Sequence, residues 1–253
     1  MSDHAPEIDG SCVSCHVLEV EGLCVNYGKV MALCDVAFRT SCGKSVALIG
    51  PNGAGKSTLI KALAGLIRPE CGEIRWRGQA MTKSSHEIAY LPQREEIDWN
   101  FPATVRGIVE MGRYPHLSWW RRFSSKDTAQ VDQALESMDL LDLQDRQISA
   151  LSGGQQQRAF LARALAQEAH VFLLDEPFTG LDADAQDRLT SMIGTLKMEG
   201  RLIIASHHDL DTVETIYDEV LMQATKQVAF GSVKDTFTKA IIDETYGRER
   251  RSA

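Results

Sequence analysis

The segment that most constrains the fold of this chain is residues 50–58, which read Gly-Pro-Asn-Gly-Ala-Gly-Lys-Ser-Thr. An apolar run at residues 45–49 precedes it, and apolar residues at helical spacing follow it as far as residue 66. A strand, a glycine-rich turn and a helix in this order form the context of a phosphate-binding loop. Glycines let several backbone N–H groups turn toward one anion, and the helix N-terminus adds positive dipole. The sequence therefore predicts a nucleotide phosphate site here.

The residue types in this loop have distinct predicted tasks. We expect Lys56 to reach the β- and γ-phosphates and the Ser57 hydroxyl to ligate Mg²⁺. Upstream, Tyr27 lies between two predicted strands and is a candidate to stack on the nucleotide base, with an ordinary hairpin aromatic as the alternative. The other predicted nucleotide contacts of the loop are Gly50, Pro51, Asn52, Gly53, Ala54, Gly55 and Thr58.

A second apolar run, residues 171–174, ends in the carboxylates Asp175 and Glu176. Ligands bind at the carboxyl ends of strands in open α/β sheets, so both side chains are expected to face the active crevice. Asp175 is a candidate to hold Mg²⁺ through water, and Glu176 to orient and deprotonate an attacking water. A strand that ends in a plain turn at Pro177 is the alternative.

Two further buried strands are predicted to end in polar residues. Residues 88–93 end in Gln93, and residues 201–206 are followed by His207 and His208. A histidine at this edge of a sheet can donate a hydrogen bond to a γ-phosphate oxygen, although a lone histidine is more often structural.

A second candidate anion site lies far downstream of the phosphate loop. Ser152, Gly153, Gly154 and Gln155 stand at the start of a predicted helix. A serine and two glycines there can form a nest of N–H groups around an anion. A simple helix cap is the more common interpretation of such a turn.

Residues 94–150 differ in character from the strands around them. Apolar residues recur at helical spacing, and aromatic side chains gather in this stretch. A self-contained helical core and a docking groove for a partner both fit this pattern, and periodicity alone leaves the choice open. The aromatic residues concerned are Trp99, Phe101, Tyr114, Trp119 and Trp120.

Composition limits the class of protein. The 253 residues suit one large α/β domain, and the net charge of −8 argues against a non-specific nucleic-acid binder. No apolar run approaches the ~20 residues that span a bilayer, and no secretion signal is evident at the start. We therefore expect a cytosolic protein whose six cysteines stay reduced.

The first 16 residues are expected to form a flexible tail. Within it, Cys12, Cys15 and His16 have the spacing of covalent haem attachment and also of half a zinc site. Haem attachment normally requires export, for which no signal is present, so an inert tail is the favoured interpretation and metal binding remains an alternative.

The phosphate loop, Gln93, residues 151–155, the Asp175–Glu176 pair and His208 now stand in a fixed order. With Leu151 before Ser-Gly-Gly-Gln, this set resembles the nucleotide-binding subunit of an ABC transporter over about residues 17–235. The resemblance implies an α/β P-loop NTPase fold with a mixed central sheet and flanking helices. It also implies an N-terminal antiparallel β subdomain and a helical subdomain at about 94–164, within one nucleotide-binding domain of residues 17–253.

The resemblance further implies roles for single residues. Two such domains pair head to tail, so that ATP with Mg²⁺ lies between the loop of one chain and residues 152–155 of the other. Gln93 resembles the residue that senses Mg²⁺ and the water and links to the membrane partner. Asp182 resembles a residue of the loop that crosses the dimer interface, and His208, rather than His207, aligns with the switch histidine.

A narrower resemblance concerns the substrate. Residues 98–105, 111–114 and 207–210 are similar to those of importers of manganese, zinc or chelated iron, whereas residues 112–116 are shared with iron–siderophore importers. This implies an ATPase on the cytoplasmic face of the membrane, bound to permease subunits near Trp99 and Phe101 and served indirectly by an extracytoplasmic metal-binding protein. Soluble ABC ATPases of translation or DNA repair are the remote alternative, and no nucleic-acid partner is expected.

Overall fold

The computed structural model describes residues 16–81, 86–99, 101–117 and 123–247. The β-strands are β1 (Val17–Tyr27), β2 (Val30–Ser41), β3 (Ser45–Ile49), β4 (Cys71–Trp76), β5 (Gln79–Ala80), β6 (Ile88–Leu91), β7 (Val171–Leu174), β8 (Leu202–Ser206), β9 (Glu219–Ala224) and β10 (Lys226–Ser232). The α-helices are α1 (Lys56–Leu63), α2 (Val105–Glu110), α3 (Ser125–Ser137), α4 (Gly153–Ala166), α5 (Ala183–Met198), α6 (Val213–Ile216), α7 (Val233–Thr236) and α8 (Lys239–Gly247). Short 3₁₀ helices are η2 (Arg94–Glu96), η3 (Met111–His116), η4 (Leu141–Leu143), η5 (Ile148–Ala150) and η6 (Leu210–Thr212).

The described strands form one mixed sheet in the order β5-β4-β1-β2-β10-β9-β3-β8-β7-β6. Strands β1, β2, β4 and β5 pair antiparallel, whereas β9, β3, β8, β7 and β6 run parallel. The two parts meet where Lys226 of β10 pairs with Cys34 of β2. The sheet therefore combines an N-terminal antiparallel part with a parallel part, as expected for this fold.

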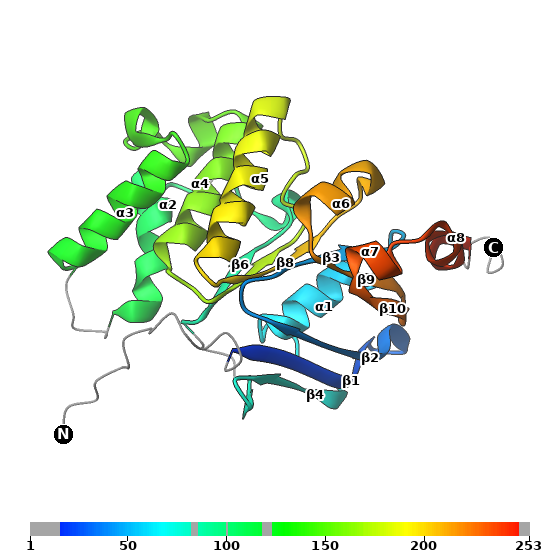
Figure 1. Cartoon of the computed structure of the whole chain (residues 1–253). Helices are drawn as coiled ribbons and strands as arrows, with labels where there is room; N and C mark the ends of the chain where they lie inside the picture. Colours follow the sequence, from blue (N-terminus) through cyan, green and yellow to red (C-terminus); the bar gives the residue numbers. More distant parts are fainter. Residues whose placement is uncertain (1–15, 82–85, 100, 118–122, 248–253) are drawn as a thin grey trace, which may run out of the picture.

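Both faces of the parallel part are covered. Val46 and Leu48 of β3 belong to a core shared with α1 and the antiparallel strands. Ala47 and Ile49, one residue out of phase, belong to the core shared with α2 to α5. Figure 1 shows the consequence, with α3, α4 and α5 on one side of the sheet and α1 on the other. Strands buried on both faces need continuous apolar runs, which explains the composition of residues 45–49, 171–174 and 202–205.

Register brings the polar ends of four strands to one edge. Leu48 of β3 pairs with Ser206 of β8, while Leu174 of β7 pairs with Ala205 of β8 and with Leu91 of β6. The residues that follow these strands, namely the phosphate loop, Asp175 and Gln93, must therefore lie together. The parallel pairing builds the candidate site.

The region between β6 and β7 is largely helical, as the sequence predicts. Residues 111–116 form the 3₁₀ helix η3, and Arg113 within it is buried and paired with Asp127 and Glu168 at 3.0 and 2.7 Å. Trp119 and Trp120 lie outside the described residues. No helix in the described ranges has the length and hydrophobicity needed to cross a bilayer.

Candidate functional site

The phosphate loop has a backbone path that only glycine can follow at two positions. A Cβ on Gly50 would lie 1.9 Å from the Gln223 carbonyl oxygen. Gly55 has φ of 95°, and a Cβ there would lie 2.5 Å from the Ala32 oxygen. Because Gly55 is also the residue before α1, the tight turn delivers the chain directly into the helix N-terminus.

The loop is held in shape by its own chain. Lys56 is buried and its Nζ donates to the Gly50 and Pro51 oxygens at 2.7 and 2.9 Å. Gln223 of β9, fully buried, donates to the Ala54 oxygen at 2.8 Å. A cavity of about 410 Å³ opens on this loop, lined by Ala32, Asn52, Gly53, Ala54, Gly55, Lys56, Ser57, Thr58, Gln93 and Glu176.

The three residues predicted as metal ligands meet beside this cavity. The Ser57 hydroxyl donates to Asp175 Oδ1 at 3.2 Å. Gln93 Nε2 lies 3.1 Å from Ser57 Oγ and 3.4 Å from Asp175 Oδ1. Gln93 and Asp175 are 36 and 118 positions from Ser57 in the sequence. The aligned ends of β6 and β7 bring them to it.

The Asp175 carboxylate is buried, and the described residues donate hydrogen bonds to only one of its two oxygens. Its side chain is 0% exposed, and Oδ2 has no hydrogen-bond partner among the described residues. Burial raises its pKa, while hydrogen bonds from Ser206 and Ser57 act in the opposite direction. A carboxylate oxygen without a partner beside a serine hydroxyl gives oxygen ligands of the type that Mg²⁺ prefers, so Asp175 and Ser57 fit the ion.

Glu176 projects toward the same cavity from a constrained backbone. Its φ is +49°, in the left-handed region that non-glycine residues seldom adopt. Its Oε1 accepts from Gln93 Nε2 at 3.1 Å and its Oε2 from the Thr179 hydroxyl at 3.3 Å. The turn after β7 therefore orients this carboxylate toward the loop at the cost of backbone strain.

Ser206 completes the cluster and was not singled out from the sequence. Its hydroxyl donates to Asp175 Oδ1 at 2.7 Å and accepts from the Glu176 N–H at 2.6 Å. It thus holds the Asp175 carboxylate and the Glu176 backbone from the neighbouring strand. The available signal was a polar residue ending an apolar run, the same pattern that marks Asp175.

The two adjacent histidines lie in different environments. His207 is 3% exposed, and its ring contacts Phe178 and Tyr217 at centroid distances of 5.2 and 5.3 Å. Its Nε2 lies 2.8 Å from the Thr212 hydroxyl, and burial lowers its pKa to about 4. His208 is exposed at the end of β8. The assignment of the switch role to His208 remains a prediction, and the buried position of His207 supports it.

The turn at residues 152–155 is a helix cap that faces solvent. Ser152 is the exposed N-cap residue of α4, its hydroxyl accepting from the Gln155 N–H at 3.4 Å. Gln155 Oε1 accepts in return from the Ser152 N–H at 3.0 Å. No residue of this turn lines the cavity at the phosphate loop. Asp182 is likewise an exposed cap, accepting from the Ala185 N–H at 2.9 Å at the start of α5.

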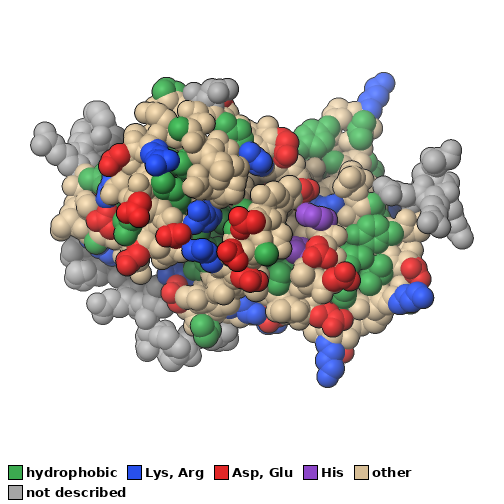
Figure 2. Space-filling view, turned by 90° about the horizontal axis from the view of Figure 1, so that it is seen from above, with side chains coloured by type: hydrophobic (Ala, Val, Ile, Leu, Met, Phe, Trp, Pro, Cys, Tyr) green, Lys and Arg blue, Asp and Glu red, His purple; other side chains and the backbone are tan. Residues whose placement is uncertain are grey.

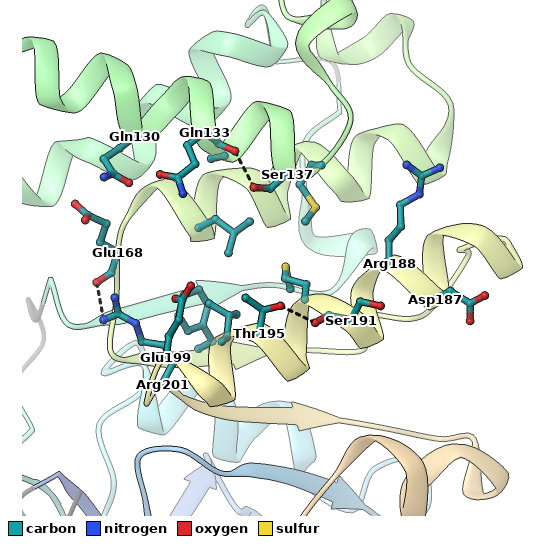
Figure 3. Close-up of a pocket in the computed structure, with 16 residues that line it drawn as sticks. Gln130, Gln133, Ser137, Glu168, Asp187, Arg188, Ser191, Thr195, Glu199 and Arg201 are labelled. Carbon is teal, nitrogen blue, oxygen red and sulfur yellow. Dashed lines mark hydrogen bonds between the residues drawn. The ribbon is translucent and has the colours of Figure 1, made fainter. Parts of the chain in front are cut away.

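A larger cavity lies away from this cluster. It has a volume of about 660 Å³ and lies between α3 and α5, with Arg188, Arg201, Glu168 and Glu199 among its lining residues (Figure 3). None of the predicted site residues lines it. On the face seen in Figure 2, acidic and basic side chains are interspersed rather than gathered by sign.

Of the N-terminal residues singled out in the sequence, the structure describes His16 and Tyr27. Tyr27 is half exposed at the end of β1, and base stacking remains a prediction. Cys12 and Cys15 lie outside the described residues. His16 packs against Trp76 and His170 at centroid distances of 6.1 and 5.7 Å. The described residues include no group of three or more His, Cys, Asp or Glu placed to hold a metal.

Known proteins share these features. The profile of the ABC transporter family matches residues 33–179. A probable metal transport system ATP-binding protein of Chlamydia trachomatis is 45% identical over 91% of this chain and 89% of its own length. The zinc transport system ATP-binding protein TroB of Treponema pallidum is 42% identical over 92% of this chain and 87% of its own length.

An ATP-binding protein of a manganese transport system and a solved structure are also similar to this chain. The manganese transport system ATP-binding protein MntB of Halalkalibacterium halodurans is 41% identical over 91% of this chain and 92% of its own length. The structure of an ATP-binding subunit of an ABC transporter superposes with a TM-score of 0.78 at 27% identity, covering 92% of this chain and 98% of the other. This chain belongs to the ABC transporter family, as an ATP-binding subunit.

Proposed function

We propose that this chain hydrolyses ATP to power import of a transition metal, manganese, zinc or iron, through a separate membrane permease. The observation that carries the proposal is the meeting of Ser57, Gln93, Asp175 and Glu176 at the phosphate loop. The named functions of the relatives support the metal, since they are metal, zinc and manganese transport proteins. The place of action is the cytoplasmic face of the membrane.

Each member of the cluster has a task in hydrolysis. Glu176 accepts the proton of the attacking water. The hydrogen bond from Gln93 orients the Glu176 carboxylate for this task. Ser57 and Asp175 would hold Mg²⁺, which when bound neutralises charge that develops on the phosphates. Lys56 exchanges its carbonyl partners at Gly50 and Pro51 for phosphate oxygens.

The solvent-facing cap at residues 152–155 supports a two-chain site. It offers a helix N-terminus and small residues to an anion, yet it does not line the cavity of its own phosphate loop. A second copy of the chain, paired head to tail, would bring this turn and Asp182 to the partner's ATP.

The segment shared with iron–siderophore importers gives no reason to prefer a siderophore as the cargo. The segment shared with those importers, residues 112–116, is built into the fold. Gly112 is packed so closely on α4 that a Cβ would lie 2.2 Å from the Arg163 oxygen, and Arg113 is a buried ion-pair residue. Such residues serve packing, so their presence does not distinguish the cargo.

A groove at the C-terminal end of α1 suits the permease contact. A cavity of about 520 Å³ lies between the end of α1, β6 and η3, and its lining residues include Leu66, Tyr90 and Met111. Leu66 lines this groove, and Tyr114 belongs to η3, which forms one side of it. Both side chains are more than half exposed, as is expected of anchors for a short permease helix. Phe101 is 47% exposed, whereas Trp99 is partly buried against Phe160, so Phe101 is the better anchor of the two aromatic residues first considered.

Reconstitution tests the function. The chain, its permease and the binding protein would be placed in proteoliposomes, and ATPase activity measured with manganese, zinc or a ferric chelate loaded on the binding protein. We expect one of these cargoes to raise turnover about tenfold. Equal turnover with every cargo, or turnover stimulated by ribosomes or DNA instead, would contradict the proposal.

A companion experiment tests the groove. Leu66→Ala and Tyr114→Ala are expected to weaken permease capture by about 2 kcal/mol each, as hot-spot residues do, and to leave the ATPase activity of the free subunit intact. Met198→Ala is the matched control, because Met198 is 84% exposed on a different helix. Permease capture that is unchanged by both groove variants would rule out this surface.

A further inference from the structure

One guanidinium group joins three segments that are far apart in the sequence. Arg94 directly follows Gln93 and begins η2. A Cβ built on Gly153 would lie 2.7 Å from Arg94 Nη2 and 2.8 Å from Cζ and Nη1. A Cβ built on Gly180, just before Leu181 and Asp182, would lie 3.6 Å from Nη1. The Arg94 side chain thus touches the turn at 152–155 and the segment leading to Asp182.

Arg94 is braced in this position by an aromatic pair. Trp99 Nε1 donates to the Arg94 carbonyl oxygen at 3.0 Å, and the guanidinium lies 5.8 Å from the Trp99 ring centroid. The Trp99 ring in turn packs edge-on against Phe160 of α4 at 5.3 Å. The loop after Gln93 is therefore fastened to α4 at two points, one apolar at Phe160 and one cationic at Gly153.

The cationic point is electrostatically unfavourable in the isolated chain. The N-terminus of a helix carries partial positive charge, and α4 has 14 residues of aligned peptide dipoles. Arg94 adds a full positive charge at this same end. Within the described part of the chain no carboxylate forms an ion pair with Arg94, and its one side-chain hydrogen bond is a long one to Gln156 at 3.4 Å.

An anion at the turn would reverse this balance. A phosphate held by the N–H groups of residues 152–155 would attract both the helix end and the guanidinium behind it. The contact between Arg94 and Gly153 would then change from repulsive to attractive. Its free energy would depend on whether the partner chain presents ATP.

We propose that Arg94 is a positioning residue that couples the Gln93 loop to the turn at residues 152–155, and that ATP presented by a second chain strengthens this coupling. The inference rests on the proposed two-chain ATP site. When residues 152–155 of one chain close on the ATP of its partner, Arg94 draws the Gln93 loop of that first chain toward the ATP on its own phosphate loop. The two sites of the dimer would be linked through a single side chain in each subunit.

The test uses full-length chains in the Glu176→Gln background, in which ATP should trap the dimer. Sedimentation velocity would measure the ATP concentration at which half of the protein is dimeric. Adding Arg94→Gln should raise this midpoint about five- to tenfold, the size of one partly buried charge–dipole interaction. Arg94→Lys should raise it less, because it keeps the charge but loses the planar group that lies on Gly153.

Two readouts separate positioning from a structural role. Binding of a fluorescent ATP analogue by the dilute monomer should be unchanged in Arg94→Gln, because the phosphate loop is intact. The melting temperature without nucleotide should be unchanged or higher, because a like-charge contact is removed. Arg39→Gln serves as the control for net charge, since Arg39 is an exposed residue of β2 paired with Glu19.

The outcomes are distinct. A melting temperature lowered by several degrees in Arg94→Gln, a midpoint equal to that of the parent, or the same shift in Arg39→Gln would each overturn the role of Arg94 while leaving the proposed function standing. Failure of the Glu176→Gln parent to dimerise with ATP would instead contradict the two-chain site, and this inference with it.

Discussion

The phosphate-loop edge and the turn at residues 152–155 are two predicted anion sites of opposite construction. The first is internal, since Asp175 and Gln223 are fully buried and Lys56 is 8% exposed. The second is at the surface, where Ser152 is exposed and, among the described residues, its N–H and hydroxyl are bonded to Gln155 of its own helix turn. One chain thus carries a predicted phosphate site in its interior and a second predicted anion site at its surface.

This difference shows where each site obtains its stability. Ser57, Asp175, Glu176 and Ser206 hold one another through hydrogen bonds between neighbouring strands, so the edge is organised before a ligand arrives. The turn is stabilised by a capping box that any helix could use. Its conformation explains why the turn folds but not why it is exposed. The proposed pairing with a second copy of the chain would account for the exposure.

The largest effect is expected at the prepared edge. Glu176→Gln keeps the shape of the side chain but removes its ability to accept a proton, so kcat should fall about 10²- to 10⁴-fold with ATP affinity retained. Steady-state ATPase assays and equilibrium nucleotide binding on the same variant check this. Turnover within a factor of three of the unmodified chain would show that another group is the base.

Asp175→Asn probes the orphaned carboxylate. Removing a buried charge whose Oδ2 has no hydrogen-bond partner among the described residues should stabilise the nucleotide-free protein by about 1–3 kcal/mol, and Mg²⁺-dependent ATP binding should be lost. Thermal unfolding with and without Mg²⁺–ATP measures both. A variant less stable than the parent without ligand would mean that Asp175 is already compensated, and the edge would then not be waiting for a cation.

The adjacent histidines provide a contrast within the site. His207→Ala should destabilise the fold by about 2–3 kcal/mol, because the ring is packed among Phe178, Tyr217 and Thr212. His208→Ala should change stability by no more than about 0.5 kcal/mol, because His208 is exposed. It should remove most ATPase activity, because His208 is the residue predicted to contact the γ-phosphate. Denaturant unfolding and turnover of both variants decide the matter, and the reverse ranking would move the switch role to His207.

A smaller effect concerns pH. Burial lowers the pKa of His207 and of His170 to about 4 from 6.5, with Arg201 adding to the effect at His170. The unfolded chain therefore binds more protons between these values, so stability is fully present above about pH 6.5 and is lost as the pH falls toward 4. Each histidine should account for about 1–2 kcal/mol of this loss between pH 7 and pH 5. Unfolding measured at pH 7 and pH 5 tests this, with His207→Gln expected to reduce the difference.

The sequence predicted the parts of this edge that carry distinctive patterns. The glycine spacing of residues 50–58 and the apolar runs before Asp175 and Gln93 placed each of these residues at a strand end, and parallel pairing placed them together. Helix α4 begins at Gly153, because Ser152 and Gln155 form a capping box whose S-x-x-Q signature is visible in the sequence. Beyond β10 the chain forms two short helices, α7 and α8, interrupted at Phe237.

Other members of the site had no local signal. Ser206 and Gln223 act across strands, and which strand lies beside which cannot be read from their neighbours in sequence. Arg94 looks like any charged residue of a loop until the fold brings it against Gly153. Trp99 is similar, since its aromatic character was evident but its contact with Phe160 required the packing of α4.

The comparison of the two anion sites can be tested most directly by blocking the exposed one. Ser152→Arg in the Glu176→Gln background fills the turn with a bulky cation and leaves the phosphate loop untouched. We expect the dilute monomer to bind one ATP with the affinity of the parent, and sedimentation velocity to show a dimer for the parent and a monomer for the variant at saturating ATP. A variant that still dimerises with ATP, or that loses ATP binding as a monomer, would contradict a site shared between two chains.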